Sequence, residues 1–437
     1  MKTAHLILLS SLLAAIHAPA QSVKDREGAV RGDRAKMQGN TRWIYNDVDG
    51  AFAEAKRTGK PLMVVLRCVP CLACMGLDAE VLLENRELKP LMDKFIRVRV
   101  INANSLDMSR FQFDYDLSFS TLFFNGDGTI YGRYGSWEHQ HDSQNRATDT
   151  LKQALAGALA LHENYPHNRS SLAGKQGKPF KYKTPVAMPT LQGKYRADLN
   201  WDGKVVQSCV HCHQVGDAIR LSIRNKRQPL PLKWIYPQPA PDAIGLQMSH
   251  HDATKVADVK EASPAAQAGI RPGERITAIM GQPVISTADI SWALNDAPDS
   301  GAIMVSTDRS SRSLKLPDGW REKSDISRRV GSWPMRAMAS GGIKLDDLSD
   351  DDRRKRGLDL NGLALFAKHV GRYGKHGAAK RQGFQNNDVI IEIDGRRDRM
   401  TESEFIGMMI RNYQPGRKVP ATVLRGQRRL QLKIPVQ

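Results

Sequence analysis

Residues 62–74 read LMVVLRCVPCLAC, and this stretch predicts the fold of the first third of the chain. Its first five residues are apolar and include the β-branched Val64 and Val65, which predicts a buried strand. Three cysteines follow the strand, Cys68, Cys71 and Cys74, and residues 75–83 are predicted to form a helix. A cysteine at the start of a helix lies where partial positive charge stabilises a thiolate. The stretch therefore indicates reactive thiols rather than disulfide staples.

The elements around this stretch predict an α/β domain over residues 41–165. A helix is expected near 48–56, a second strand at 95–100, a hairpin at 121–131 and a closing helix at 148–162. This order resembles a thioredoxin fold. Lys60-Pro61-Leu62, the Cys-x-x-Cys pair and Met75-Gly76-Leu77-Asp78 resemble the thioredoxin-like proteins of bacterial envelopes.

The resemblance implies that Cys71 is the attacking thiol and Cys74 the resolving thiol. Cys68 forms an overlapping Cys-Val-Pro-Cys with Cys71, so the Cys68/Cys71 pair is the alternative. Thioredoxins carry a cis-proline opposite the active pair, and Ser120 stands at that place here. This departure argues against ordinary dithiol exchange with peptide substrates, and inert or metal-binding cysteines are the alternative.

A second cysteine motif, Cys209-Val210-His211-Cys212-His213, has the spacing of a c-type haem attachment site. In this interpretation Cys209 and Cys212 form thioethers to the haem c vinyl groups, and His213 is the proximal iron ligand. Met248 is a candidate for the distal ligand. A zinc half-site or a structural disulfide are the alternatives. The motif lies within residues 166–240, which we expect to be a linker with a haem-binding segment.

The N-terminus predicts the compartment. Residues 1–20 contain Lys2, an apolar run over 6–16 and Ala18-Pro19-Ala20, which is the pattern of a cleaved secretory signal peptide. The apolar run is too short for a permanent membrane helix. The protein is therefore expected to be periplasmic or secreted, where haem attachment to such motifs takes place in bacteria.

The chain is basic, with 65 Lys and Arg against 46 Asp and Glu and a net charge of +19 over 437 residues. The positive residues are scattered and no aromatic-interleaved basic motif is present, so nucleic acid is not the expected partner. An acidic redox partner or an anionic membrane surface fits the charge better.

Two segments in the C-terminal half resemble PDZ domains of the bacterial periplasmic kind. Residues 241–318 contain Ile244-Gly245-Leu246, a Ser-Pro-Ala-Ala-Gln-Ala-Gly stretch and a Pro-Gly turn. The resemblance implies that Ile244, Gly245 and Leu246 form the loop that holds a peptide carboxylate. Residues 325–437 resemble a second copy, with residues 361–365 as its carboxylate loop.

The chain as a whole resembles a bacterial family of thioredoxin-like/PDZ domain-containing (seleno)proteins. We expect a multidomain protein that combines an α/β domain with mainly-β domains: a thioredoxin-like domain, a short haem-binding segment and two PDZ-like domains. The predicted function is a periplasmic redox protein that joins thiol–disulfide chemistry and haem electron transfer to peptide binding. The alternative is a non-enzymatic PDZ adaptor with structural or metal-binding cysteines. No Gly-x-Ser-Gly-Gly nucleophile turn is present, so the protein is expected not to be a protease.

Overall fold

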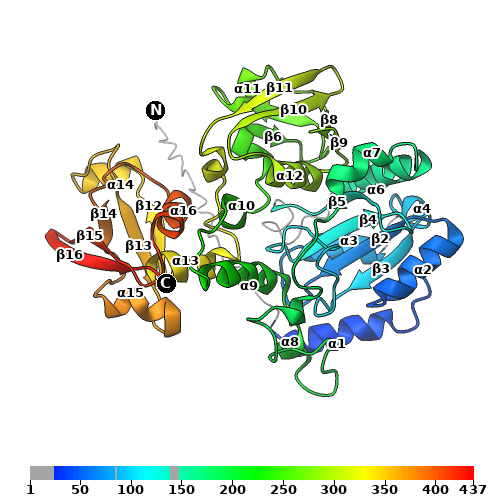
Figure 1. The fold of residues 1–437 in the computed structure, drawn as a ribbon, viewed down its shortest axis with the longest axis horizontal. Helices are drawn as coiled ribbons and strands as arrows, with labels where there is room; N and C mark the ends of the chain where they lie inside the picture. Colours follow the sequence, from blue (N-terminus) through cyan, green and yellow to red (C-terminus); the bar gives the residue numbers. More distant parts are fainter. Residues whose placement is uncertain (1–23, 84–85, 138–146) are drawn as a thin grey trace, which may run out of the picture.

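The computed structural model describes residues 24–83, 86–137 and 147–437, and it contains three units, each built around a β-sheet (Figure 1). The expected signal peptide at 1–20 lies outside the described residues. We use "first unit" for β1–β5 with α2, α3, α4 and α6, "second unit" for β6–β11 with α11 and α12, and "third unit" for β12–β16 with α13–α16. Within the described ranges, no helix has both the length and the apolar character needed to cross a membrane.

The first unit is a five-stranded mixed sheet with strand order β1-β3-β2-β4-β5, in which β4 runs antiparallel to the other four strands. Its elements are β1 (Ile44–Tyr45), α2 (Val48–Thr58), β2 (Leu62–Arg67), α3 (Met75–Leu83), α4 (Lys89–Met92), β3 (Ile96–Val100), β4 (Phe119–Phe124), β5 (Ile130–Tyr134) and α6 (Thr148–Glu163). Residues of β2 alternate between two hydrophobic clusters, one on each face of the sheet. Both faces are covered, and this explains why β2 is apolar along nearly its whole length.

Helix α1 (Arg26–Met37), which the sequence analysis did not predict, packs against the first unit. Asp33 of α1 accepts hydrogen bonds from Arg99 of β3, with the shortest N–O distance at 2.6 Å. Its Glu27 carboxylate accepts the backbone N–H groups of Val205 and Val206 at 3.0 and 3.1 Å. The helix therefore ties the sheet to the start of the second cysteine motif.

The segment 166–240, expected to be a linker with a haem-binding segment, has helices of its own and packs on the first unit. It contains α7 (Arg169–Leu172), α8 (Val205–Ser208), α9 (Cys212–Arg224) and α10 (Leu232–Ile235). Met188 and Leu191 are buried in one cluster with Met108 and Val210. Asn104 in the first unit donates to the carbonyl of Ser208 and accepts from the N–H of Val210. Apolar contacts and hydrogen bonds to the backbone thus hold the segment on the first unit. The residues that make these contacts are scattered along the sequence and show no periodicity.

The second unit has a four-stranded sheet, β11-β10-β8-β9, and a separate pair, β6-β7. Its elements are β6 (Leu246–Met248), β7 (Val256–Val259), α11 (Pro264–Gln267), β8 (Ile276–Ile279), β9 (Gln282–Pro283), α12 (Thr287–Asp296), β10 (Gly301–Thr307) and β11 (Ser311–Leu316). Helix α12 packs against β5 of the first unit. Buried Lys175 and Asp289 of α12 form an ion pair of 2.6 Å at this junction.

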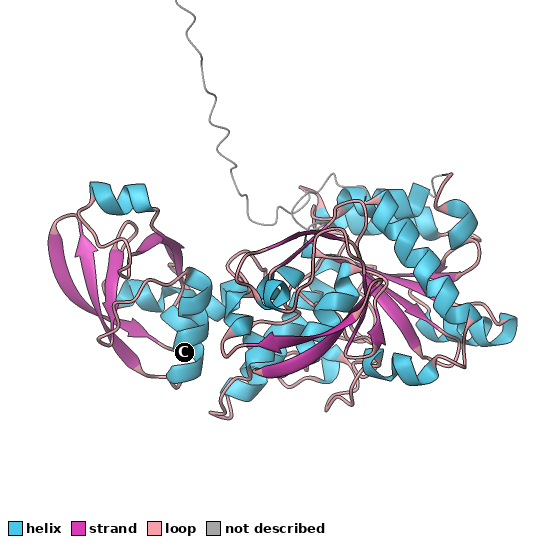
Figure 2. Ribbon diagram, turned by 90° about the horizontal axis from the view of Figure 1, so that it is seen from above, coloured by secondary structure: helices cyan, strands magenta, loops and turns pink. Residues whose placement is uncertain are grey.

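The third unit is a sheet with strand order β12-β13-β14-β15-β16 and lies at one end of the molecule (Figure 2). Its elements are α13 (Ser332–Ser340), β12 (Ile343–Asp347), α14 (Asp350–Lys355), β13 (Leu365–Val370), α15 (Ala378–Arg381), β14 (Val389–Ile393), α16 (Glu402–Asn412), β15 (Lys418–Arg425) and β16 (Arg428–Pro435). Strand β12 pairs antiparallel with β13, as β6 does with β7. The loop before β12 is therefore the counterpart of the loop before β6. This corrects the prediction that residues 361–365 have that role, because they follow β12 and lead into the start of β13.

Candidate thiol site

Two cysteines of the first motif lie in contact at the carboxyl end of β2. The sulfurs of Cys68 and Cys71 are 3.0 Å apart, and either can donate a hydrogen bond to the other. The Cys71 N–H donates to the Cys68 carbonyl at 3.0 Å, so a tight turn holds the pair. The Cys68 N–H donates to the carbonyl of Ser118 at 2.8 Å. All five cysteines of the chain are free thiols in this structure.

The surroundings of this pair favour a thiolate on Cys71. The hydrogen bond from Cys68 lowers the pKa of Cys71 to about 6, and positive charge from Arg67 and His213 acts in the same direction. Arg67 is buried, and its Nη2 donates to the Cys71 carbonyl at 2.7 Å. The same interaction with Cys71, together with burial, raises the pKa of Cys68. One thiol of the pair is therefore charged at neutral pH and the other keeps its proton.

Cys74 has a different environment from this pair. It is buried in the core cluster on one face of the sheet, with Leu77 and Val81 of α3. Burial raises the pKa of Cys74 to about 11. Its backbone has a φ of 59°, in the left-handed region, one residue before α3 begins. The geometry thus brings together Cys68 and Cys71, the overlapping pair, rather than the Cys71/Cys74 pair implied by the resemblance.

The second motif lies next to the first. His211, at the N-cap position of α9, places Nδ1 3.3 Å from the Cys68 sulfur. Burial lowers the pKa of His211 to about 4, with a further contribution from the charges of His213 and Arg26. The imidazole is therefore neutral at pH 7 and Nδ1 can accept the Cys68 proton. His211 is thus the residue of the second motif that contacts the first motif. The haem interpretation gave it no role.

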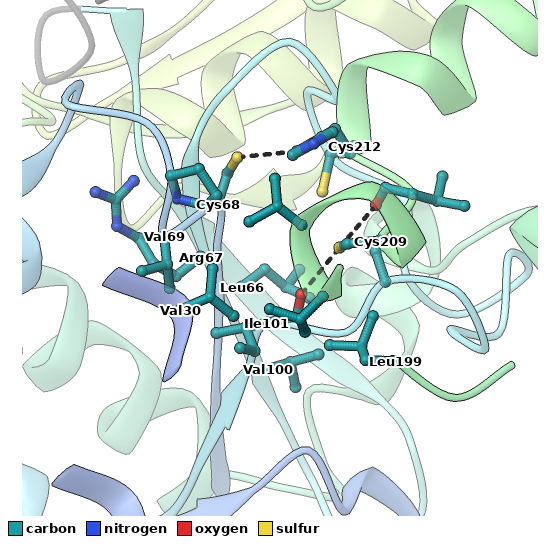
Figure 3. A pocket seen from close by; sticks show the side chains of 16 residues that line it. Val30, Leu66, Arg67, Cys68, Val69, Val100, Ile101, Leu199, Cys209 and Cys212 are labelled. Carbon is teal, nitrogen blue, oxygen red and sulfur yellow. Dashed lines mark hydrogen bonds between the residues drawn. The ribbon is translucent and has the colours of Figure 1, made fainter. Parts of the chain in front are cut away.

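Cys209 and Cys212 line the same small, mostly apolar cavity as Cys68 (Figure 3). The Cys209 sulfur donates weakly to the carbonyls of Ile101 and Val210, each at 3.5 Å. Burial raises the pKa of Cys209 to about 11 and that of Cys212 to about 12. These two thiols are therefore protonated at neutral pH.

The arrangement of these residues does not fit a covalent haem. The cavity beside Cys209 and Cys212 measures about 30 Å³, whereas sites for drug-sized ligands occupy roughly 300–1,000 Å³. Cys212 packs against the core cluster that also holds Phe113, and Cys209 against the cluster of Val30 and Leu199. Room for a macrocycle would require the second motif to move away from the first unit.

The two iron ligands predicted with the haem lie in different surroundings. The His213 ring stacks on His211 with centroids 5.8 Å apart, and its Nδ1 lies 3.8 Å from an Asp217 carboxylate oxygen. Met248 is buried in the core of the second unit, so the structure does not bring it into the His213 environment. Among the described residues, no group of three or more His, Cys, Asp and Glu side chains is arranged to hold a metal ion.

A larger cavity of about 640 Å³ opens between the second and first units. Gly245, Leu246 and Met248 line it on one side, and residues of α12 line it on another. Gly245 has a φ of 87°, and a Cβ added there would lie 2.1 Å from the Ser263 side chain, so the loop requires glycine at this position. Ile244 is buried in the core of the second unit.

Two family models match parts of the chain. Residues 43–126 match a thioredoxin-like model, and residues 255–304 match the PDZ domain model. The chain contains a thioredoxin-like domain and a PDZ domain. The thiol site lies in the thioredoxin-like domain, and the 640 Å³ cavity is lined by both. A PDZ domain supports the expected binding of peptide or protein partners.

Two curated relatives have names that describe them as proteases. The chain is 27% identical over 177 residues to a "Probable periplasmic serine endoprotease DegP-like" of Pseudomonas savastanoi pv. phaseolicola, which covers 39% of this chain and 34% of the relative. A protein of the same name from Pseudomonas fluorescens is 27% identical over 175 residues, covering 39% and 35%. The exclusion of a protease from the sequence was therefore wrong. The chain spans about a third of the length of these relatives.

Solved structures with similarity to the chain include two HtrA-type proteases. One is "HtrA-type protease AlgWS227A with decapeptide", with 18% identity, a TM-score of 0.21 and coverage of 31% of this chain and 40% of that one. The other, "HtrA-type protease AlgW with tripeptide", has 16% identity, a TM-score of 0.21 and coverage of 38% and 53%.

Three residues of the thiol site were missed in the sequence. Arg67 stands directly before Cys68, and His211 stands inside the second motif, so both were visible but had no assigned role. Asp78 pairs with Arg67 at 3.2 Å and with Arg99 at 2.6 Å, and this fixes the guanidinium that bonds Cys71. Only the contact of Cys68 with His211, 143 residues away, identifies the histidine as part of the site.

Proposed function

We propose that this protein is a periplasmic thiol–disulfide exchange protein. Cys71 is its attacking thiolate and Cys68 its resolving thiol, and its PDZ domain binds partner proteins. The observation that carries the proposal is the contact of 3.0 Å between the two sulfurs, in which one thiol stabilises the thiolate of the other. The periplasmic location is supported by the names of the curated relatives.

The exchange begins when the Cys71 thiolate attacks a disulfide of the substrate. A bond forms between Cys71 and one substrate sulfur, and the other substrate sulfur leaves as a thiolate. Cys68 then attacks the Cys71 sulfur, which forms the Cys68–Cys71 disulfide and releases the second substrate thiolate. The substrate gains two electrons and the protein loses two, so the step balances without a further reactant.

His211 is assigned the base for the second half of this exchange. While Cys71 is a thiolate, the Cys68 proton is directed at Cys71. Once Cys71 is in the mixed disulfide it carries no charge, and the acceptor left next to Cys68 is Nδ1 of His211 at 3.3 Å. Because His211 is neutral at pH 7, it can take this proton as Cys68 attacks.

The proposal is tested by disulfide reduction with the full-length protein, with insulin as substrate and dithiothreitol as reductant. We expect Cys71→Ser to abolish the reaction and Cys68→Ser to accumulate a mixed disulfide detectable by mass spectrometry. Cys74→Ser is the matched control, expected to retain activity at unchanged melting temperature. If Cys68→Ser were active and Cys74→Ser inactive, the redox-active pair would be Cys71 and Cys74, as the resemblance implied. If the wild-type protein and all variants are inactive, the proposed exchange is wrong, and the alternative function of a PDZ adaptor with structural cysteines is favoured.

Covalent haem at Cys209, Cys212 and His213 stays a prediction, and no step of the exchange passes through it. When bound, haem supplies one-electron transfer. Its test is the absorption spectrum of protein from a host able to make cytochromes: a Soret band that persists after denaturation would require the second motif to open. A casein degradation assay on the same material measures the proteolysis that the names of the relatives suggest.

We further propose that the third unit is a second PDZ-like domain whose groove is filled by its own chain. The Leu345 N–H of β12 donates to the Glu402 carboxylate of α16 at 2.7 Å, between the strand and helix that would flank a peptide. Buried Arg336 of α13 forms an ion pair of 2.5 Å with the same carboxylate. Peptide binding is therefore assigned to the first PDZ domain. Titration of the full-length protein with a labelled C-terminal peptide should give one site; two equivalent sites would contradict this assignment.

A further inference from the structure

We propose that the thioredoxin-like domain forms a third wall of the PDZ peptide groove and that the groove presents a bound C-terminal tail to the thiol site. This inference rests on the proposed function and adds a substrate class to it. The substrates are proteins with a disulfide a few residues upstream of a free C-terminal carboxylate.

The 640 Å³ cavity has the composition of such a groove. On the PDZ side it is lined by β6, and by Thr287, Ala288 and Ser291 of α12, whose small side chains leave space for a peptide. On the opposite side it is lined by residues of the thioredoxin-like domain: Phe113, Leu117, Ser120, Arg133, Ser136 and Trp137. A PDZ domain alone would leave this last side open to solvent.

One edge of β6 is available for a peptide strand. Within the described chain, β6 pairs with β7 and with no other strand. An extended peptide can therefore add to the free edge, with its carboxylate at the Gly245 loop. Lys260 also lines the cavity, and its backbone N–H donates to the Gly245 carbonyl, which places this lysine beside the loop. The residues upstream of the carboxylate then run along β6 towards Met248.

The far end of that path meets the thioredoxin-like domain. Gly135 and Ser136 line a small cavity together with Ser249, the residue after β6. Gly135 lies against β4, because a Cβ added to it would be 2.8 Å from the Phe119 carbonyl oxygen. Ser120, at the place where thioredoxins have the proline that faces their cysteines, is on the same wall. A tail on β6 is thus directed towards the substrate side of the thiol site.

The same wall is directly connected to the attacking pair. Leu117 lines the groove, and the next residue, Ser118, accepts the Cys68 N–H at 2.8 Å and an Arg67 N–H at 3.2 Å. The groove width is set by α12, because Asp289 accepts the Arg133 N–H at 3.0 Å and the Lys175 ammonium at 2.6 Å. These buried contacts attach the PDZ helix to β5, so both walls of the groove are joined at this junction.

The test uses the full-length protein and a fluorescent peptide with an intramolecular disulfide close to a free C-terminus, together with its C-terminally amidated twin. We expect the amidated peptide to bind at least about tenfold more weakly and to be reduced more slowly at low concentration. Insulin reduction measures the thiol chemistry separately. If the protein reduced insulin but reduced the two peptides at equal rates, presentation of the tail by the groove would be wrong. The proposed function would remain intact. Loss of insulin reduction as well would count against the thiol function itself.

Three serine substitutions separate the walls. Ser291→Trp fills the groove from the PDZ helix, Ser136→Trp fills it from the thioredoxin-like domain, and Ser313→Trp on the exposed surface of β11 is the matched control. We expect both groove variants, but not the control, to weaken peptide binding at least about tenfold. Weakening by Ser291→Trp alone, at equal melting temperatures, would overturn the third wall.

A photocrosslinking peptide tests the same wall on the wild-type protein, and so does not depend on how the variants fold. With the reactive group upstream of the carboxylate, mass spectrometry should find adducts within residues 117–120 or 135–137 as well as in the PDZ domain. Adducts confined to β6 and α12 would overturn the proposal.

Discussion

The two Cys-x-x-Cys motifs of this protein have the same spacing, have half-buried cysteines and have opposite electrostatics. In Cys68-Val69-Pro70-Cys71 one thiol supports the other's negative charge, and the pKa of Cys71 falls to about 6. In Cys209-Val210-His211-Cys212 both thiols pack into apolar clusters, and burial raises the pKa of Cys212 to about 12. The difference shows that spacing places two thiols near each other, whereas charge and solvation decide which of them reacts.

The largest expected effect is loss of exchange on removal of a single sulfur. Cys71→Ser should lower insulin reduction at least about a thousandfold, because no other thiolate is present to attack. Cys212→Ser, the matched change in the other motif, should stay within about threefold of wild type. Equal losses in the two variants would mean that the motifs act as one redox unit.

Alkylation of the native protein measures the same contrast without a substrate. At pH 7, iodoacetamide should modify Cys71 about a hundredfold faster than Cys209 or Cys212, because nearly all of Cys71 is thiolate and its two counterparts are protonated. As pH falls, the Cys71 rate should drop by half near pH 6 rather than near pH 8.5. Peptide mapping after timed quenching gives each rate, and modification of all five cysteines in urea is the control. If the midpoint of the Cys71 alkylation rate lay above pH 8, the proposed electrostatic difference between the two motifs would be wrong.

The link between the motifs is tested at His211. His211→Gln should slow resolution of the Cys71 mixed disulfide by about 10–100-fold, while the first attack is little changed. His213→Gln is the neighbouring control, expected to leave resolution within about twofold. Stopped-flow measurement with a chromogenic disulfide separates the two steps. Slowing of the first step alone would show that His211 acts only through Cys71.

The smallest expected effects are changes in the pKa of Cys71, which rank the interactions that lower it. Cys68→Ala removes the strongest contribution and should raise the pKa of Cys71 by more than one unit, and His213→Gln should raise it by a few tenths. Thiolate absorbance at 240 nm during a pH titration reports both. If long-range charges set this pKa rather than the Cys68 hydrogen bond, His213→Gln would raise the pKa of Cys71 more than Cys68→Ala does.

Much of the fold and part of the site were determined by the sequence alone. The apolar run of β2 followed by cysteines and α3, and the Ala-Ala-x-x-Gly and Pro-Gly signals of the PDZ domain, are local patterns that backbone geometry turns into local structure. The thioredoxin-like and PDZ assignments therefore followed from short stretches.

Tertiary structure decided which residues act together. Cys68 meets His211, α1 bonds the residues just before the second cysteine motif, and Ser136 lines the same cavity as β6, although these segments are far apart in the chain. The choice of Cys68 over Cys74 as partner of Cys71 depends on which thiol is turned into the core. Burial, charge and hydrogen bonding between distant segments set the pKa of each thiol, and no spacing within one motif encodes them.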